Sequence, residues 1–295
     1  MTTKLRITGL TRLLRRLSAV LLLLATSLVN AAENSPEQLA RAALDAFLVD
    51  WNRSDLAAIQ EHLSFPHVTH GPGLLLIAQE EGDFQQNFAA LSAQGWQRSS
   101  FDKFKVLQVS ADKVNFLVDF TRYGNDGETL SKGQVFYVVS KQEDGWGMQY
   151  RSGGPRMDSL PEAVRDRAIL EATSAFYDFF DAFNGQDNEA LSEVNHVPQV
   201  MLIENTFIYG SDRDSLPVAV NFEQLTARES WDFSVAEDIE VIHAMPGKVV
   251  FQLEFERFNS DGDKYRRVPA LWVLSRVDGA WGVQFRSLMA PTFSQ

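Results

Sequence analysis

The sequence predicts an α+β fold built from two tandem domains, and three repeated features lead to this prediction. The apolar stripe of a helix in residues 40–51 returns in residues 172–183, 132 positions further along the chain. Alternating apolar residues, typical of strands, follow at 114–120 and again at 249–255. Both copies close on one pattern, Trp-Gly-x-Gln-x-Arg-Ser. Copies of about 130 residues match the usual size of a domain, so we expect a duplication.

The first helix of each copy is predicted from its start signal and its period. Ser35 suits the N-cap, with Pro36 at the first helical position. Apolar residues at i, i+3, i+4 and i+7 then form one face of an amphipathic helix. In the second copy Leu160-Pro161-Glu162 opens the corresponding helix, whose stripe is rich in Phe. Shorter helices are expected at residues 55–62, 80–93, 187–194 and 215–228.

The later part of each copy reads as an antiparallel meander. In residues 114–120 and 249–255 every second residue is apolar and most of the residues between them are polar, the period of a sheet with one buried face. Asn125-Asp-Gly127 and Ser260-Asp-Gly262 are hairpin-turn sequences that lead into the next strands. These following strands are expected at residues 133–140, 146–151, 268–275 and 281–286.

The first 31 residues are expected to be a secretory signal peptide. Basic residues from Lys4 to Arg16 precede an apolar run at 17–25, and Val29-Asn-Ala31 offers a cleavage site. The alternative is a membrane anchor, for which the apolar run is short. The expected division is therefore a signal peptide at 1–31 and domains at 33–153 and 154–295. We expect a periplasmic or secreted bacterial protein with no stable membrane insertion after cleavage.

Composition excludes several classes of function. The chain has 27 Lys and Arg against 39 Asp and Glu, a net charge of −12, which argues against a nucleic-acid partner. The absence of Cys excludes disulfides, thiolate metal sites and Cys nucleophiles. Five His leave few ligands for a transition metal, so we expect neither a metal nor another cofactor.

Taken together, these residues resemble the nuclear transport factor 2-like (NTF2-like) superfamily. The resemblance lies in Phe-Pro-His-Val at 65–68, Val-Pro-Gln-Val at 197–200, and the endings at 145–152 and 280–287. It covers nearly all of residues 36–288 and is nearest to a bacterial, SnoaL-like branch. It implies two tandem cone-shaped domains, each with three helices packed on a curved antiparallel sheet.

The resemblance implies a fold more than a function. Such a cone can hold an apolar ligand at its mouth, and family members include isomerases, dehydratases and cyclases beside proteins that only bind. Single-domain members commonly pair sheet to sheet, so an intramolecular pseudo-dimer or a homo-oligomer is expected.

The candidate catalytic residues are His67, Asp45 and Tyr123. A His beside a carboxylate is suited to general-base work, and a Tyr can polarise a carbonyl. His67 and His70 differ by three positions, so on a regular strand they point to opposite faces. We expect Gly71-Pro72-Gly73 to break the strand at His70, which would leave a rim histidine and a solvated one. This purely structural interpretation of both histidines stays open.

Comparison of the copies limits where catalysis could lie. Gln199 stands in the second copy where the first has His67, and Tyr177 stands where it has Asp45. Any acid/base chemistry is therefore expected within residues 36–152. The second copy reads as a packing partner, because its first helix is rich in Phe and its strand at 271–273 is apolar on both faces.

A second set of candidates would bind a ligand. Two arginine positions recur in both copies, as Arg122 and Arg257 and as Arg151 and Arg286. We expect these side chains either to form ion pairs with Asp119, Glu254, Asp55 or Asp187 or to bind an anionic ligand. The candidate ligand-binding residues are Trp51, Arg122, Tyr137, Arg151, Arg257 and Arg286.

Two functions stay open on these grounds. The first is an exported protein that binds a small apolar or carboxylate ligand in a cone-shaped pocket. The second is an isomerase-, dehydratase- or cyclase-type enzyme that uses the acid/base residues of the first domain without a metal.

Overall fold

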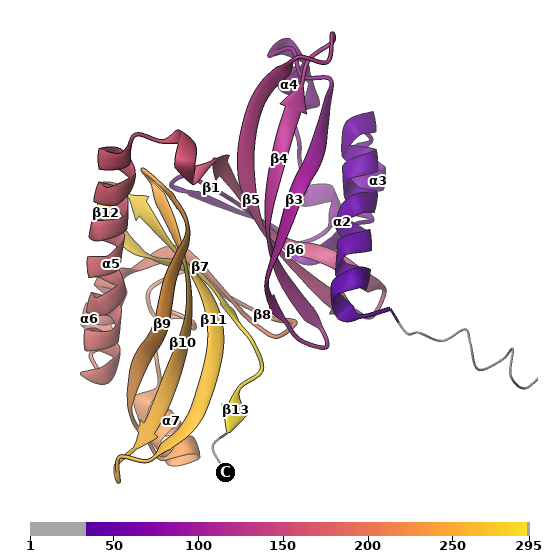
Figure 1. Cartoon of the computed structure of the whole chain (residues 1–295). Helices are drawn as coiled ribbons and strands as arrows, with labels where there is room; N and C mark the ends of the chain where they lie inside the picture. Colours follow the sequence, from indigo (N-terminus) through magenta and orange to yellow (C-terminus); the bar gives the residue numbers. More distant parts are fainter. Residues whose placement is uncertain (1–33, 294–295) are drawn as a thin grey trace, which may run out of the picture. The chain divides into compact units, whose positions relative to one another are not determined.

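Each half of the chain begins with a long helix. In the computed structural model, which describes residues 34–293, α2 spans Pro36–Arg53 and α5 spans Glu162–Asn184 (Figure 1). The buried residues of α2 are Ala40, Leu44, Phe47 and Trp51, members of the predicted apolar stripe.

The predicted signal peptide lies outside the described residues. None of the helices within residues 34–293 has both the length and the apolar content needed to cross a membrane.

The short helices begin where a side chain caps them. Asp55 accepts a hydrogen bond from the backbone N–H of Ala58, and Asn87 accepts one from Ala90, so each satisfies a free N–H of the first turn. The third helices are shorter than the predicted 80–93 and 215–228, because they begin only after the caps Asn87 and Asn221. The short helices are α3 (Leu56–Gln60), η1 (Glu81–Asp83), α4 (Phe88–Ala93), η2 (Met157–Ser159), α6 (Asn188–Val194) and α7 (Phe222–Glu229).

The first half contains a six-stranded sheet in the order β2-β1-β6-β5-β4-β3. Neighbouring strands run antiparallel except β1 and β6, which run parallel with Thr69 beside Arg151. The strands are β1 (Leu63–Gly71), β2 (Leu74–Ala78), β3 (Arg98–Val109), β4 (Lys113–Tyr123), β5 (Thr129–Gln142) and β6 (Gly145–Pro155). The predicted boundary between residues 153 and 154 falls inside β6.

The second half repeats this topology strand for strand. Its order is β8-β7-β12-β11-β10-β9, with the short β13 beside β11, and β7 and β12 again run parallel. Its strands are β7 (Asn195–Ile203), β8 (Thr206–Gly210), β9 (Trp231–Met245), β10 (Lys248–Asn259), β11 (Lys264–Val277), β12 (Ala280–Leu288) and β13 (Thr292–Phe293). The predicted tandem α+β fold is confirmed. Each sheet is mixed rather than wholly antiparallel. The strand that precedes the meander, β1 or β7, lies beside the last strand of the meander, β6 or β12, and runs parallel to it.

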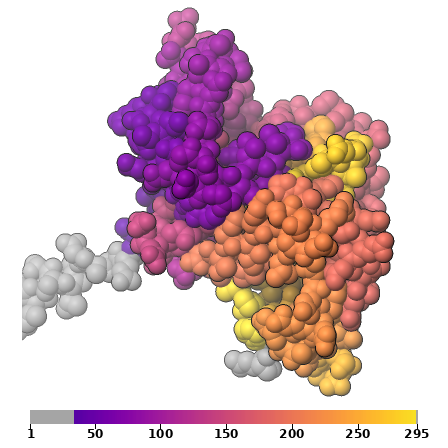
Figure 2. Space-filling model, turned by 180° about the vertical axis from the view of Figure 1, so that it is seen from behind, coloured from indigo at the N-terminus to yellow at the C-terminus, as the bar shows by residue number. Residues whose placement is uncertain are grey.

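The two faces of each sheet have different partners. On β4 the side chains of Val114, Phe116 and Val118 pack with α2 in the core of the first half. Leu117, one position out of phase, belongs to another cluster that combines residues of both halves. At its centre Tyr150 stacks on Phe285 with ring centroids 3.7 Å apart. The first half, in violet tones, and the second half, in orange and yellow, meet in Figure 2.

Candidate functional site

A cavity of about 540 Å³ lies in the first half, within the range of small-molecule sites. It is lined by α2, by the inner faces of β3, β4 and β5, and by the ends of β1 and β6. The residues that line it include Phe47, Leu48, Trp51, Thr69, Gln86, Ser99, Phe101, Phe120, Arg122, Lys132, Val135, Tyr137 and Arg151. Four of the predicted ligand-binding residues are among them, namely Trp51, Arg122, Tyr137 and Arg151.

Much of the cavity wall is aromatic or aliphatic. Phe47 and Trp51 project from one face of α2, and their rings lie 5.5 Å apart. Phe101 from β3 meets Tyr137 from β5 edge to face at 5.9 Å. Gly133 leaves space for the neighbouring Phe120 ring, because a Cβ there would lie 2.5 Å from it. These surfaces suit the apolar body of a small organic molecule.

Arg151 brings a positive charge to this apolar wall. Its Nε donates a hydrogen bond to Thr69 Oγ1 at 3.2 Å, and its Nη2 donates one to Gln86 Oε1 at 3.3 Å. The guanidinium also lies 5.2 Å from the Trp51 ring. All these partners are neutral. Burial lowers the pKa of Arg151 from its usual value, as does the charge of nearby Arg122.

Arg122 lies on the neighbouring part of the wall and has no acidic partner either. Within residues 34–293, no carboxylate forms an ion pair with Arg122 or with Arg151. The lining residues include Lys132 but no Asp or Glu. The cavity is therefore locally cationic in a chain whose net charge is −12. Asp119, one of the expected acidic partners of Arg122, instead pairs with Arg156 at 2.8 Å.

Tyr137 supplies a buried hydroxyl to the same cavity. Burial raises the pKa of its phenol to about 12, and the nearby arginines lower it only in part. The phenol therefore stays protonated near neutral pH and can act as a hydrogen-bond donor. Two guanidinium groups and one hydroxyl donor thus share the cavity with its aromatic wall.

The structure does not bring the three predicted catalytic residues together. Asp45 lies outside the buried stripe of α2, where its carboxylate pairs with Arg41 at 3.0 Å. Tyr123 follows Arg122 on β4 and so has the opposite orientation; its ring packs beneath the guanidinium of Arg98 at 4.0 Å. Neither residue lines the cavity.

His67 is buried behind the cavity wall. Its Nδ1–H donates to the backbone carbonyl of Met148 at 2.8 Å, and its ring meets Phe84 edge to face. Burial lowers the pKa of His67 to about 3, and the charge of Arg151 adds to this effect. A general base works best with a pKa near the operating pH, so this environment does not suit His67 to that role.

His70 departs from its predicted environment. The strand does not break there, because β1 continues to Gly71 and turns only at Pro72 and Gly73. Its side chain is not solvated but buried at 1% exposure, with Nδ1 2.7 Å from Tyr150 Oη and Nε2 3.0 Å from Gln284 Oε1. The expected rim position of His67 is likewise wrong, because that side chain is also 1% exposed.

The equivalent arginines of the second half have different surroundings. Arg257, the counterpart of Arg122, forms an ion pair with Glu229, so its expected partners Glu254 and Asp187 are wrong. Glu229 also pairs with Arg266 at 3.0 Å. Arg286, the counterpart of Arg151, donates to Gln199 Oε1 and to the carbonyl of Pro217. Burial lowers the pKa of Arg286 to about 10.

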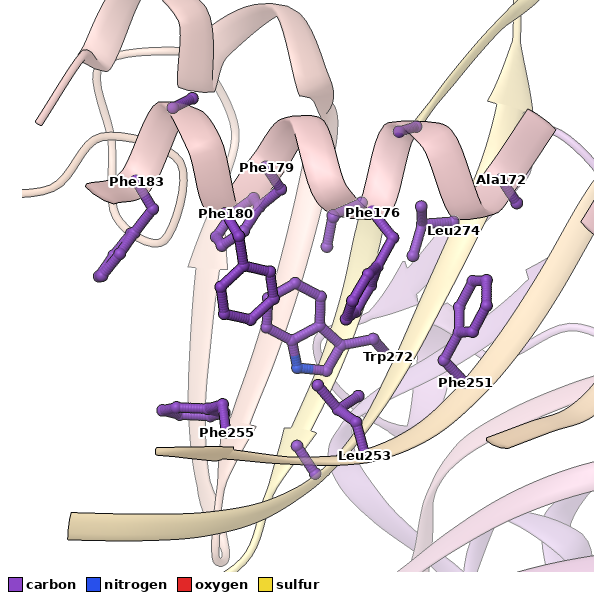
Figure 3. Close-up of a cluster of buried hydrophobic side chains, with 14 of the residues drawn as sticks. Ala172, Phe176, Phe179, Phe180, Phe183, Phe251, Leu253, Phe255, Trp272 and Leu274 are labelled. Atoms are coloured by element: carbon purple, nitrogen blue, oxygen red, sulfur yellow. The ribbon is translucent and has the colours of Figure 1, made fainter. Parts of the chain in front are cut away.

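Large aromatic side chains occupy the interior of the second half. Phe180 stands where the first half has Leu48, and Trp272 stands where it has Tyr137. The two rings stack at 5.5 Å with an interplanar angle of 11°, and both residues are buried (Figure 3). Phe176 and Phe179 pack against the same Trp272 ring. The space that corresponds to the cavity of the first half is thus filled by side chains.

Some cavity residues are not among the predicted site residues. Thr69 and Gln86 bind Arg151, while Ser99 and Phe101 lie on β3, a strand outside the predicted elements. For Thr69 a signal existed, because it is the next residue of β1 on the same face as His67. Gln86 lies between η1 and α4, where no periodic pattern indicates its direction.

The family comparison agrees with this topology. A family model described as "NTF2-like protein (DUF6841)" matches residues 36–149. These residues form an NTF2-like domain. The second half has the same strand order and the same parallel pair, so the chain contains two units of this topology in tandem. A comparison with curated proteins gave no match.

Several solved structures are similar to part of this chain. An NTF2-like protein with a cystatin-like fold from Novosphingobium aromaticivorans is 16% identical, over 56% of this chain and 99% of its own, with a TM-score of 0.36. A ketosteroid isomerase-like protein from Erwinia carotovora atroseptica is 23% identical, over 39% and 92%, with a TM-score of 0.29. An NTF2-like protein of unknown function from Shewanella oneidensis is 16% identical, over 40% and 98%, with a TM-score of 0.32.

Proposed function

We propose that the first NTF2-like domain binds a small organic carboxylate with an apolar body. The observation that carries this proposal is the pair Arg122 and Arg151, which share one cavity without an acidic residue. Placing a cation in an apolar environment without a counter-charge costs several kcal/mol, and a bound anion offsets that cost. A guanidinium also matches the two oxygens of a carboxylate.

The second half supports this interpretation by contrast. Where the same arginine position serves only the fold, as at Arg257, the chain supplies the carboxylate of Glu229. The residue aligned with Glu229 in the first half is Gln94, which carries no charge. The missing counter-charge of Arg122 is therefore specific to the half that has the cavity.

The wall supports an apolar body for the ligand. Phe47, Trp51 and Phe101 offer aromatic surface, and Tyr137 offers a hydroxyl donor toward the anionic end. The acid/base alternative gains no such support, because Asp45 and Tyr123 lie outside the cavity and the low pKa of His67 makes it a weak base.

A matched pair of probes tests the proposal. We expect 2-naphthoate to bind more tightly than its neutral analogue 2-naphthamide in isothermal titration calorimetry. Arg122→Gln should weaken naphthoate binding about tenfold or more, the loss of one charge-assisted contact, and leave the weak binding of the amide unchanged. Arg257→Gln is the control and should leave both affinities unchanged. Equal affinity of the wild type for acid and amide would contradict the proposal.

The cellular location belongs to the same proposal. We propose export of the chain with removal of residues 1–31, on the basis of the basic start and the apolar run of the sequence. N-terminal sequencing of the protein from the periplasm or the medium tests this, and an intact Met1 in a membrane fraction would contradict it.

A further inference from the structure

Two backbone segments at the strand ends form one side of the cavity. They are residues 69–71 of β1 and 153–155 of β6, and the two strands run parallel side by side. Thr69 and Arg151 project from these strands and are hydrogen bonded to each other. The position of the Arg151 guanidinium therefore depends on where these two segments lie.

A lysine of the second half binds both segments from behind. Lys248 is fully buried at the start of β10, and its Nζ donates to the carbonyl of His70 at 2.9 Å and to that of Gly153 at 3.4 Å. Nearby, His243 Nε2 lies 3.0 Å from the carbonyl oxygen of Pro155. Three carbonyl groups of the cavity wall thus have partners in the other half.

The contact is also close sterically. A Cβ atom at Gly154 would lie 2.7 Å from the sulfur of Met245, so a larger residue there would force the Met245 side chain to move. Three residues of the β9–β10 turn region, His243, Met245 and Lys248, therefore support the wall together.

The first half contains the counterpart of this lysine. Lys113 is the residue aligned with Lys248, and its Nζ donates to the carbonyls of Leu202 at 3.3 Å and Leu288 at 2.6 Å in the second half. Leu202 and Leu288 are in turn aligned with His70 and Gly153. The two lysines are equivalent in burial and bonding, but Lys113 acts on the half whose interior is filled by aromatic rings.

We propose that Lys248 is a positioning residue for the anion site, through which the second domain sets the geometry of a cavity that it does not line. The binding part of this inference rests on the proposed function. The second domain is then a support for the first, with its own interior closed and its strand ends holding the wall behind Arg151.

The test compares Lys248→Met with Lys113→Met in the full chain. Each variant removes one buried ammonium group and leaves two carbonyls without that donor, so both should lower the melting temperature. Only Lys248→Met should weaken 2-naphthoate binding, by about tenfold, while Lys113→Met should stay within about twofold of the wild type. A purely structural role for both lysines predicts equal effects on affinity.

Hydrogen exchange provides a readout that needs no ligand. Lys248→Met should speed amide exchange in residues 69–71 and 151–154, and Lys113→Met should instead speed it in residues 201–204 and 287–289. Unchanged exchange at 69–71 and 151–154 in Lys248→Met would overturn the inference. If the wild type fails to bind naphthoate while this exchange pattern appears, the positioning role stands and the proposed function fails.

A milder pair covers the case in which Lys248→Met does not fold. His243→Leu removes the contact to Pro155, and its counterpart Gln108→Leu removes a hydrogen bond to Ala270. His243→Leu should weaken naphthoate binding and speed exchange at 151–154, and Gln108→Leu should do neither. Equal behaviour of these two variants would overturn the inference.

Discussion

At the scale of single residues, a few substitutions between the copies decide which half has an open interior. Leu48 and Tyr137 of the first half correspond to Phe180 and Trp272 of the second, where the larger rings stack. Gln94 corresponds to Glu229, which supplies the counter-charge of Arg257. The same backbone thus encloses a cationic cavity in one copy and a packed aromatic core in the other.

This comparison predicts that the cavity of the first half can be filled by introducing the larger side chains found at the equivalent positions of the second half. Leu48→Phe with Tyr137→Trp should reduce 2-naphthoate binding at least tenfold in calorimetry, because the rings occupy the space of the ligand. The melting temperature should stay near that of the wild type, since the second half accommodates the same pair.

The matched control is Phe180→Leu in the second half. It should lower stability by about 1–3 kcal/mol through the cavity it creates and leave naphthoate affinity unchanged. Undiminished binding by the Leu48→Phe, Tyr137→Trp protein would place the ligand elsewhere.

At the scale of elements, each long helix is fastened to its sheet by one asparagine near its C-terminal end. Asn52 of α2 donates to the carbonyl of Ser99 at 3.0 Å and accepts from its N–H at 2.7 Å. Asn184 of α5 makes the same two bonds to Ser234, at 2.9 and 2.8 Å. These bonds hold the helix that carries Trp51 against the strand that carries Phe101, and so help to shape the cavity.

Replacement of either asparagine should cost similar stability in the two halves. Asn52→Ala and Asn184→Ala each leave a partly buried backbone N–H and C=O without that partner, which costs about 1–3 kcal/mol. Urea unfolding measures the effect, and the exposed Gln97→Ala should change the free energy of unfolding by less than about 0.5 kcal/mol. A loss for Asn52→Ala no larger than that of the control would contradict the prediction.

At the scale of the whole molecule, the two units share a buried cluster that has polar members. His70 from the first half bonds to Tyr150 of its own half and to Ser275 and Gln284 of the other. A neutral imidazole satisfies this arrangement, with Tyr150 Oη–H donating to Nδ1 and Nε2–H donating to Gln284. Burial, together with the charge of Lys248, lowers the pKa of His70 to about 3.

The depressed pKa predicts a loss of stability in acid. The unfolded chain binds a proton near pH 6.5 and the folded chain only near pH 3, so stability falls as the pH drops through this interval. His70→Gln removes this contribution, and its destabilisation relative to the wild type should shrink by on the order of 2 kcal/mol between pH 7.5 and pH 4.5.

Chemical denaturation of both proteins at the two pH values measures this difference. His67 and His243 have similarly lowered pKa values but are present in both proteins, so their contributions cancel. A gap between wild type and variant that does not change with pH would show that His70 does not contribute in this way.

Most of the fold could be predicted from the sequence, because its signals are local. The apolar stripes of α2 and α5, the caps Asp55 and Asp187, and the alternation along β4 and β10 depend on residues only a few positions apart. The duplication was visible because equivalent residues recur at a nearly constant spacing. The predicted length of the third helices was wrong, because α4 and α7 begin only after the N-caps Asn87 and Asn221, which lie inside the predicted segments.

For the site, the sequence identifies candidate residue types, but the packing of distant segments brings only some of them together. Trp51, Arg122, Tyr137 and Arg151 come from four elements, and only the order and register of the strands bring them to one cavity. The two-residue period of a strand places Tyr123 on the opposite face from Arg122. No such period predicts where Asp45, which lies on a helix, stands relative to these two residues. The cavity without acidic residues lies in the first copy, and Lys248 of the second copy supports its wall. Both features depend on packing between residues far apart in the chain.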